Sequence, residues 1–434
     1  YEMLRSLVGS EMCIRDSDYV PEPSCDLNAP FSMLATTLEA NKFIGRLLTG
    51  KIQTGTLHVN DTVKVLNGEN QELERVRISK ILAYRGLERV ALEEAHAGDI
   101  VAVAGIVKGT VADTICALDV NQSIKAQPID PPTLAMTFSI NDSPLAGREG
   151  DKVTSRMIWD RLCKEAEGNI ALKISRTDSS DSFEVAGRGE LQLGVLIETM
   201  RREGFELSIS RPRVLMKRDE NGQLLEPFEE VVVDVDEEFS GTVVEKLGQR
   251  KAELVEMIPS QIGNKVRLIF NAPSRGLIGY HSEFLTDTRG TGIMNRIFKD
   301  YEPYKGEIDS RRNGVLISSE NGTAIAYSLW KLQDRGPMFI DANVPVYVGM
   351  IIGEHTKSND LEVNPTKSKQ LTNIRAAGKD EAIDLIPPRK LSLEQALSYI
   401  QEDELLEVTP KTLRLRKRIL DPIARKRAKP EVMA

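Results

Sequence analysis

Six segments decide the fold: TLAMTFSI (133–140), TSRMIWDRLCKEAE (154–167), ALKISRT (171–177), SFEVAGR (182–188), a helical stretch over 190–203, and ELSISRPRV (206–214). Strand-length runs rich in Val, Ile, Leu, Phe and Thr alternate here with stretches of helical length. Their order is β-α-β-β-α-β, which is the split βαβ arrangement of ferredoxin-like domains. Because Pro128, Pro131 and Pro132 mark a boundary just before these segments, we expect one ferredoxin-like domain over residues 128–217.

The same order of elements returns after a turn at residues 219–222. The segments are EEVVVDVDEE (229–238), a helical TVVEKLGQRKAEL (242–254), VEMIPSQ (255–261), VRLIFNAPS (266–274), a short helix from Leu277, and IMNRIFKDYEP (293–303). Two consecutive domains of one topology form an internal structural repeat, although their sequences share little identity. We expect the second ferredoxin-like domain over residues 226–303.

Short strands and turns fill residues 18–122. FSMLATTLE (31–39), TLHVNDTVKVL (56–66) and DIVAVAGI (99–106) have strand length, and Asn67-Gly68 is a hairpin signal. No convincing long helical pattern interrupts these strands. The pattern predicts a small closed β-barrel at this end of the chain.

Residues 304–434 have another pattern, for which we expect a distinct, mostly-β C-terminal domain. GVLISSENGTAIAYSLWKL (314–332) predicts a hairpin with Asn321-Gly322 at its turn, LSLEQALSYIQ (391–401) a helix capped by Ser392, and LEVTPKTLRLRKRIL (406–420) a return to strand. Polar residues 355–379 predict a long loop, and the tail ARKRAKPEVMA (424–434) predicts disorder. The expected fold class is therefore a multidomain β and α+β protein.

The first seventeen residues, YEMLRSLVGSEMCIRDS, show neither helical nor strand periodicity and join abruptly to DYVPEPSCDLNAP (18–30). Part of this segment, SLVGSEMCIRDS, resembles translated adapter sequence. We therefore expect residues 1–17 to be a non-native head and leave them out of the fold prediction.

Several classes of chemistry are disfavoured by the sequence. A P-loop GTPase needs GxxxxGK[ST], whose backbone N–H groups and lysine hold the phosphates, and neither this motif nor NKxD is present. The four cysteines form no CxxC pair and the four histidines no pair with ligand spacing. We therefore expect no catalytic, metal or cofactor site in this chain. A transmembrane helix needs about eighteen consecutive apolar residues, and no such stretch or signal peptide is present, which favours a cytoplasmic protein without a membrane partner.

The net charge of -8 conceals an asymmetry along the chain. Residues 355–434 carry sixteen Lys/Arg against twelve Asp/Glu, so the rest of the chain is strongly acidic. An acidic body with a basic end suits a protein that presents one surface to a polyanion. A solvated, charged C-terminus is the alternative interpretation.

The cations at this end gather in two segments. The loop 355–379 contains Lys357, Lys367, Lys369, Arg375 and Lys379 against only Asp360 and Glu362, and the basic strand after it contains Lys411, Arg414, Arg416, Lys417 and Arg418. Because side chains alternate along a strand, Arg414, Arg416 and Arg418 share one face. Together the two segments predict a site for an RNA backbone. The alternative is an edge strand that its charges protect from aggregation.

Two glycine-rich turns are further candidates. In Gly187-Arg188-Gly189-Glu190, a strand ends and a helix begins, Gly189 can take a positive φ, and Glu190 falls in the first helical turn. We expect these four residues to form a structural or interdomain junction, with phosphate binding by Arg188 as the alternative. The second candidate consists of PSRGLIGY (273–280) and LTDTRGTG (285–292), which are rich in Gly, Ser, Thr and Arg and contain Arg275 and Arg289. Such a sequence suits either close approach of the backbone to a phosphate chain or tight turns that join a sheet to a helix.

Five segments resemble the BipA/TypA translational GTPases closely. They are AGREGDKVTSR (146–156), FEVAGRGELQLGVLIETMRREGFELSISRP (183–212), APSRGLIGYHSEFLTDTRGTG (272–292), GVLISSENGTAIAYSLW (314–330) and MIIGEHTKSNDLEVNP (350–365). The resemblance covers residues from about 20 to about 428. It implies a translation-factor barrel, two ferredoxin-like domains similar to domains III and V of elongation factor G, and a family-specific RNA-binding domain.

The resemblance also implies a function. Such proteins bind the 70S ribosome, act in large-subunit assembly and in growth under cold or other stress, and approach large-subunit rRNA and the acceptor end of tRNA. By this resemblance we expect a monomer in the bacterial cytoplasm that lacks the GTPase domain, so GTP and Mg would be bound in the full-length parent.

Two other interpretations stay open. The chain could be the corresponding region of elongation factor G or elongation factor 4, which would lack the segment from Tyr304 onward as it stands here. It could also be an α+β metabolic enzyme with carboxylates, such as Glu229-Glu230 or Glu237-Glu238, in a cleft between the repeated domains.

Overall fold

The computed structural model describes residues 19, 21, 25–41, 44–86, 88–126, 131–169, 171–259, 264–308, 313–368 and 384–428. The non-native head expected at residues 1–17 lies outside the described residues. By its internal contacts the chain divides into two compact units. One contains residues 1–129 with 164–170, and the other contains residues 130–163 with 171–434.

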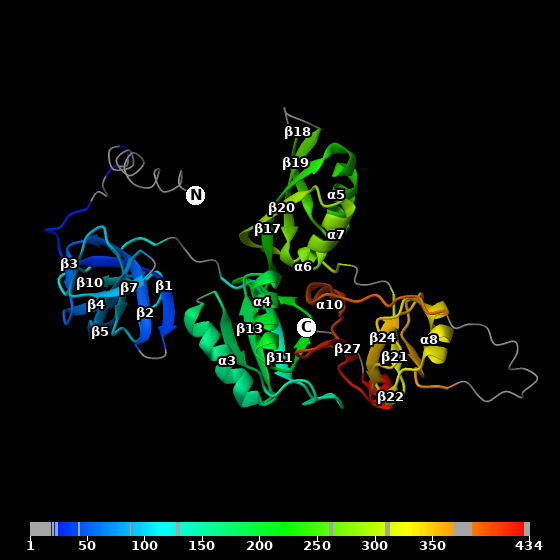
Figure 1. Cartoon of the computed structure of the whole chain (residues 1–434). Helices are drawn as coiled ribbons and strands as arrows, with labels where there is room; N and C mark the ends of the chain where they lie inside the picture. The colour runs from blue at the N-terminus through cyan, green and yellow to red at the C-terminus, as the bar shows by residue number, and fades with distance from the viewer. Residues whose placement is uncertain are drawn as a thin grey trace, which may run out of the picture. The chain divides into compact units, whose positions relative to one another are not determined.

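The first unit is built on an eight-stranded sheet with strand order β5-β4-β10-β1-β2-β9-β6-β7 (Figure 1). The strands are β1 (Ser32–Asn41), β2 (Gly45–Thr54), β4 (Thr62–Leu66), β5 (Glu72–Arg77), β6 (Lys80–Arg85), β7 (Glu88–Leu92), β9 (Ile100–Ala104) and β10 (Thr114–Cys116), with a separate pair of β3 (Thr56–His58) and β8 (Glu94–His96). Apolar residues of these strands, among them Met33, Ile52 and Val65, are fully buried in one core.

The sheet of the first unit is open in the described residues. Its path ends at β5 and β7, so the expectation of a closed barrel is wrong. Because β5 carries the sequence ELERVR, with two arginines and two glutamates along a solvent-facing strand, it has the charged character of an edge. The broader fold class, a mixed β and α+β protein with several sheets, is confirmed.

The second unit begins with the first of the two expected ferredoxin-like arrangements, apart from the last turns of its first helix, residues 164–168, which are grouped with the first unit. Its elements are β11 (Leu134–Ile140), α3 (Ser155–Gly168), β12 (Lys173–Arg176), β13 (Ser182–Gly187), α4 (Glu190–Arg202) and β14 (Leu207–Ser210). The strand order β12-β13-β11-β14, all antiparallel, is that of a ferredoxin-like sheet. Along α4, Leu193, Leu196, Ile197 and Met200 recur at helical spacing and are buried, and this stripe packs the helix onto the sheet.

The second ferredoxin-like arrangement repeats this order. It consists of β17 (Leu224–Asp236), α5 (Glu237–Gln249), β18 (Glu253–Pro259), β19 (Lys265–Pro273), α6 (Ser274–Leu277), α7 (Tyr280–Asp287) and β20 (Ile293–Pro303), and β16 (Lys217–Arg218) pairs with the start of β17. The strand order β18-β19-β17-β20 matches the first arrangement. The helix begins five residues before the predicted Thr242, because Glu237 and Glu238 occupy its first turn, where carboxylates meet the positive end of the helix dipole.

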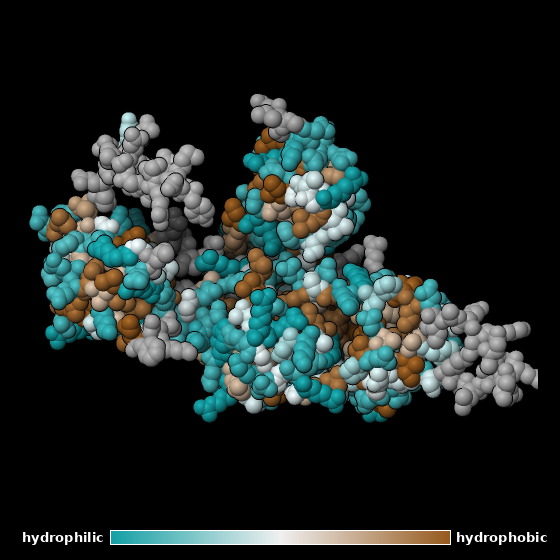
Figure 2. Space-filling model, viewed as in Figure 1, coloured by the Kyte–Doolittle hydropathy of each residue, from teal (hydrophilic) through white to brown (hydrophobic). Residues whose placement is uncertain are grey.

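The edge strand β18 differs from the rest of this sheet in its exposure. All seven of its residues are exposed, including the apolar Leu254, Val255, Met257 and Ile258. Figure 2 shows hydrophobic residues on the surface of this part of the molecule.

The remaining elements correct two predictions, and a strand among them (Leu361–Val363) lies inside the long loop predicted over residues 355–379. They are β21 (Val315–Ser318), β22 (Gly322–Thr323), α8 (Ala326–Leu332), a 3-10 turn (Gln333–Arg335), β23 (Pro345–Val346), β24 (Met350–Glu354), β25 (Leu361–Val363), α10 (Leu393–Tyr399), β26 (Glu404–Val408), β27 (Leu413–Lys417) and α11 (Pro422–Arg427). The hairpin predicted over residues 314–332 is wrong, because β21 pairs with β24 and β25 while AYSLWKL forms α8. The start of the predicted disordered tail forms α11, which Asp421 caps and a proline begins. The capping of α10 by Ser392 is confirmed, with a complete capping box.

One sheet joins the first ferredoxin-like arrangement to the C-terminal region. β26 pairs with β14, β27 pairs with β26, and the ladder continues through β24, β21 and β25. Figure 1 shows β27 beside the strands of this arrangement. The two regions also share a core, in which Phe138 and Ile209 lie in one cluster with Leu406 and Leu415. The C-terminal region expected as a domain of its own is therefore built onto the sheet of the first ferredoxin-like arrangement.

Candidate nucleic-acid interface

The basic strand β27 lies in the middle of the shared sheet. β26 pairs with it along one side and β24 along the other, so it is not an edge strand. Arg414, Arg416 and Lys417 are only 6%, 1% and 2% exposed. The expected cationic face open to solvent is therefore wrong at these three positions. A buried charge is tolerated only where it is paired and hydrogen-bonded, which makes the partners of these cations informative.

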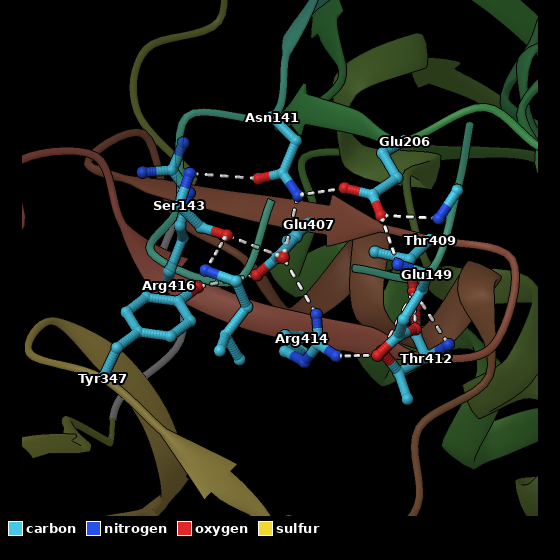
Figure 3. A network of polar contacts seen from close by, with 12 residues as sticks. Asn141, Ser143, Glu149, Glu206, Tyr347, Glu407, Thr409, Thr412, Arg414 and Arg416 are labelled. Carbon is cyan, nitrogen blue, oxygen red and sulfur yellow. Dashed lines mark hydrogen bonds and ion pairs between the residues drawn. The ribbon is translucent and has the colours of Figure 1, made fainter. Parts of the chain in front are cut away.

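Arg414 belongs to a buried polar network (Figure 3). Its guanidinium donates to Glu407 Oε1 over 2.9 Å, across the β26–β27 ladder. Glu407 is fully buried and also accepts from Ser143 Oγ at 2.8 Å, Asn141 Nδ2 at 2.9 Å and Tyr347 OH at 2.7 Å. One carboxylate thus gathers side chains from the loop after β11, from β27 and from the segment before β24. Burial raises the pKa of Tyr347 well above its ordinary value, and the negative charge of Glu407 adds to the rise.

A second carboxylate, Glu206, organises the loop after β11. It accepts backbone N–H groups of Gly147, Glu149 and Gly150 at 2.8, 3.0 and 2.7 Å, and the Asn141 side chain at 3.1 Å. Burial alone would raise the pKa of Glu206, but the donors outweigh it and the pKa lies below its ordinary value. The loop therefore wraps around an internal anion.

Glu149, which this loop carries, connects the network to the turn between β26 and β27. Its carboxylate accepts from Thr409 Oγ1 at 2.5 Å and Thr412 Oγ1 at 2.9 Å, and pairs with Arg414. Figure 3 shows the side chains of Glu149, Glu206 and Glu407 converging from three elements on this region. The network joins the C-terminal region to the first ferredoxin-like arrangement by polar contacts as well as by the shared core.

The other two buried cations of β27 are also neutralised internally. Lys417 Nζ lies 2.7 Å from Asp360, 2.7 Å from Asp403 and 3.0 Å from Glu404. Burial would lower the pKa of Lys417, yet the surrounding carboxylates raise it above its ordinary value. Arg416 pairs with Asp142 and donates to Ser208 Oγ at 3.1 Å. These contacts leave Arg414, Arg416 and Lys417 unavailable to an RNA phosphate.

The other candidate cations fall into three groups. Lys357, Lys367, Lys411 and Arg418 are exposed, whereas Lys369, Arg375 and Lys379 lie outside the described residues. Arg289 is also exposed, with its side chain 77% accessible and 3.9 Å from Glu238. Arg275 is different, because its side chain is 14% accessible and pairs with Glu226, which is itself buried. Arg275, which belongs to α6, is therefore part of the packing of the second ferredoxin-like arrangement.

The junction at residues 187–190 joins elements of both ferredoxin-like arrangements. Gly189 has φ -167°, so the expected positive φ is wrong and its backbone is simply extended. Glu190 does stand in the first turn of α4, where its carboxylate accepts the backbone N–H of Gly279 at 3.2 Å and lies 3.7 Å from Arg296. Burial raises the pKa of Glu190, while Arg296 and the Gly279 N–H act against the rise. Arg188 is exposed.

Sequence patterns did not single out the acids that organise this region. Glu206, Glu404 and Glu407 are each fully buried, at the edges or inside the strand patterns ELSIS and ELLEV. A lone glutamate within an apolar strand is a weak signal that a cation from a neighbouring strand lies opposite. The neighbouring strand here is LRLRK, and only the pairing of β26 with β27 shows the match.

Metal-binding clusters and membrane-spanning helices are both absent from the described residues. No group of three or more His, Cys, Asp and Glu side chains there could hold a metal ion. None of the helices in those ranges is both long and apolar enough to cross a bilayer.

Comparison with known proteins gave three family matches. Residues 313–422 match the TypA/BipA C-terminal domain, residues 223–312 the elongation factor G C-terminus, and residues 45–116 elongation factor Tu domain 2.

The chain is also similar to whole proteins called large ribosomal subunit assembly factor BipA. It is 47% identical to that of Haemophilus influenzae over 411 residues, which are 94% of this chain and 66% of the relative. The relative from Escherichia coli K12 is 46% identical over 412 residues, 95% of this chain and 67% of its own length. The relative from Bacillus subtilis is 45% identical over 411 residues, 94% of this chain and 67% of its own length. The chain thus spans about two thirds of the length of these curated relatives.

Proposed function

Because the chain belongs to the BipA/TypA family, we propose that it is the ribosome-contacting part of a translational GTPase that acts in assembly of the large ribosomal subunit. In this proposal it works in the bacterial cytoplasm as a monomer, and its partners are the 70S ribosome, large-subunit rRNA and the acceptor end of tRNA. Growth under cold or other stress is the condition in which we expect it to matter.

We assign no nucleotide hydrolysis to the residues of this chain. GTP and Mg would be held by residues outside this sequence, since neither GxxxxGK[ST] nor NKxD occurs in it. We further propose the domain limits 18–122, 128–217, 226–303 and 304–434. In this division, β26 and β27 of the last domain extend the sheet of the domain 128–217.

The observation that best supports RNA binding is the contrast between buried and exposed cations at the basic end of the chain. The buried cations of β27 are neutralised by internal acids, whereas Lys357, Lys367, Lys411 and Arg418 are exposed. The segment 355–379 also contains Lys369, Arg375 and Lys379, so positive charge concentrates there. We propose this segment, with Lys411 and Arg418, as the contact for RNA phosphates, and Arg289 as a separate contact.

A salt titration of ribosome binding tests this surface. The variant has the five cations of the segment replaced by glutamine, namely Lys357, Lys367, Lys369, Arg375 and Lys379. The logarithm of the binding constant falls as log salt concentration rises, and each phosphate contact contributes about 0.7–0.9 to the magnitude of this negative slope. Loss of five contacts should therefore reduce the magnitude of the slope by about 3–5. Ribosome co-sedimentation at several salt concentrations measures the slope.

A matched control separates a site from a general loss of charge. Five other exposed lysines are replaced by glutamine in the control, namely Lys51, Lys80, Lys108, Lys173 and Lys299. The control has the same net charge as the variant. An equal drop in slope for both proteins would mean that binding depends on total charge and not on the proposed segment.

A further inference from the structure

A cavity of about 330 Å³ lies between the two ferredoxin-like arrangements, inside the second unit. Its walls come from the start of β11, from the junction at the start of α4, from β17 and β20, and from both ends of α6. The volume is at the lower end of the range for small-molecule sites, which suits a ligand the size of one nucleotide. The RNA surface proposed above uses none of these walls.

The charged groups in the cavity are incompletely satisfied. The Arg296 guanidinium lies 3.7 Å from Glu190 Oε1 and 3.8 Å from Glu229 Oε2. Charge-assisted hydrogen bonds are about 2.7–2.9 Å long, so the guanidinium attracts both carboxylates but forms a hydrogen bond with neither at these distances. Both carboxylates can accept further N–H donors, and the planar guanidinium can stack on a planar ring.

A free cation stands at one side of the same cavity. The backbone of Arg188 is held on both sides, since its N–H donates to Gln192 Oε1 at 2.9 Å and its carbonyl accepts from Thr133 Oγ1 at 2.9 Å. Its guanidinium makes no ion pair with any residue that the structure describes. An exposed arginine on a fixed backbone is well suited to bind a phosphate group.

The remaining walls are mostly apolar or aromatic, with Thr133 and Ser274 as polar exceptions. Phe298 and Ile278 line the cavity, and their uncharged side chains can pack against the faces of a flat ring. The cavity therefore combines a cation for a phosphate, two carboxylates for N–H donors and flat or apolar walls. We propose that this cavity binds one nucleotide, with the phosphate on Arg188 and the base between Arg296, Glu190 and Glu229.

Two kinds of ligand would present one nucleotide to this cavity: a free nucleoside monophosphate, or an unstacked nucleotide of a single-stranded RNA. Isothermal titration calorimetry of the whole chain with each of the four nucleoside monophosphates tests the first kind. Fluorescence anisotropy with a labelled single-stranded RNA hexamer tests the second. Inorganic phosphate serves as a ligand without a base.

Two variants and their matched controls test the assignment. Arg188→Gln and Glu229→Gln each remove one proposed contact, and a hydrogen bond to a charged group is worth about tenfold or more in affinity. Arg156→Gln, on the exposed face of α3, and Glu230→Gln, the exposed neighbour on β17, carry the same charge changes away from the cavity. Urea unfolding of all four variants identifies any loss of stability.

Weaker binding of a monophosphate or of the hexamer by at least tenfold in both cavity variants, with neither control affected, supports the proposal. Binding of the hexamer alone identifies RNA as the ligand, and binding of monophosphates identifies the free nucleotide. No saturable binding of either ligand, or phosphate binding as tight as nucleotide binding, overturns it. These titrations use no ribosome, so the variant lacking the five cations of segment 355–379 should still bind, even if the proposed ribosome contact fails.

Discussion

The carboxylate of Glu407 accepts a hydrogen bond from the guanidinium of Arg414 over 2.9 Å, and both side chains are almost completely buried. The pair lies across two strands that continue the sheet of the first ferredoxin-like arrangement. A basic strand that resembles an RNA-binding ladder in sequence thus has a structural role. Its charge is needed to neutralise acids that the fold has buried.

Replacing Glu407 by glutamine is expected to destabilise the second unit by about 1–3 kcal/mol, because the buried Arg414 would lose one of its two carboxylate partners and keep only Glu149. Urea unfolding measures the free energy change. Glu230→Gln changes an exposed glutamate of β17 and should stay within about 0.5 kcal/mol of the parent. A loss below about 1 kcal/mol for Glu407→Gln would show that the pair contributes little.

Deleting residues 404–428 is expected to loosen the first ferredoxin-like arrangement as well as the C-terminal region. β14 would lose its neighbour β26, and the core around Phe138 would lose Leu406 and Leu415. Hydrogen exchange of the amides in β11 and β14 measures the effect. Exchange should become faster in these strands, while the strands of the first unit keep their protection. Unchanged exchange in β14 would show that this sheet is stable without its C-terminal strands.

The Glu206 carboxylate is expected to make stability depend on pH. Its pKa in the folded protein lies below the ordinary value of 4.5, because backbone donors outweigh the opposing effect of burial. The folded state therefore binds fewer protons than the unfolded state, and this contribution is complete above the ordinary pKa and disappears as pH falls through the folded pKa. Unfolding free energies of the parent and Glu206→Gln should differ most near neutrality and converge in acid. A constant difference would contradict the assignment.

Arg414→Gln and Arg416→Gln are expected to leave the salt slope of ribosome binding unchanged. Both guanidinium groups are paired inside the protein, so they displace no counterions when RNA binds, and their removal does not change the salt dependence. Co-sedimentation below the unfolding temperature of each variant measures the slope. A decrease similar to that expected for the segment 355–379 would show that β27 reaches RNA after all.

Gly279→Ala is expected to be destabilising by more than about 1 kcal/mol. Its φ of 73° is unfavourable for alanine, and an added Cβ would collide with Ser398 of α10. Gly241→Ala is the matched control, because Gly241 lies inside α5 with no atom near its missing Cβ. That change should stabilise the protein by up to about 1 kcal/mol through helix propensity. Thermal unfolding of both variants gives the comparison, and equal effects would exclude the collision.

Local sequence patterns were enough to predict the two ferredoxin-like arrangements. The apolar period of α4 and the strand-length runs on either side of it depend only on neighbouring residues, so they can be read without knowing the tertiary structure. The capping box at Ser392 and Gln395 is local in the same sense. The hairpin predicted at Asn321-Gly322 failed because the pairing of β21 with β24 is a contact between residues far apart in sequence.

The sequence by itself determined the helices and strands of the two ferredoxin-like arrangements, the repeat of one topology, and the concentration of cations toward the end of the chain. Only the tertiary structure decided which of those cations face solvent. An alternating Arg-Leu-Arg pattern predicts two faces of a strand but not what covers them. The pairing of β27 on both sides buries Arg414 against Glu407 and Arg416 beside Asp142 and Ser208. Burial depends on strand neighbours and on acids such as Glu149, 265 residues away from Arg414, and no local pattern contains that information.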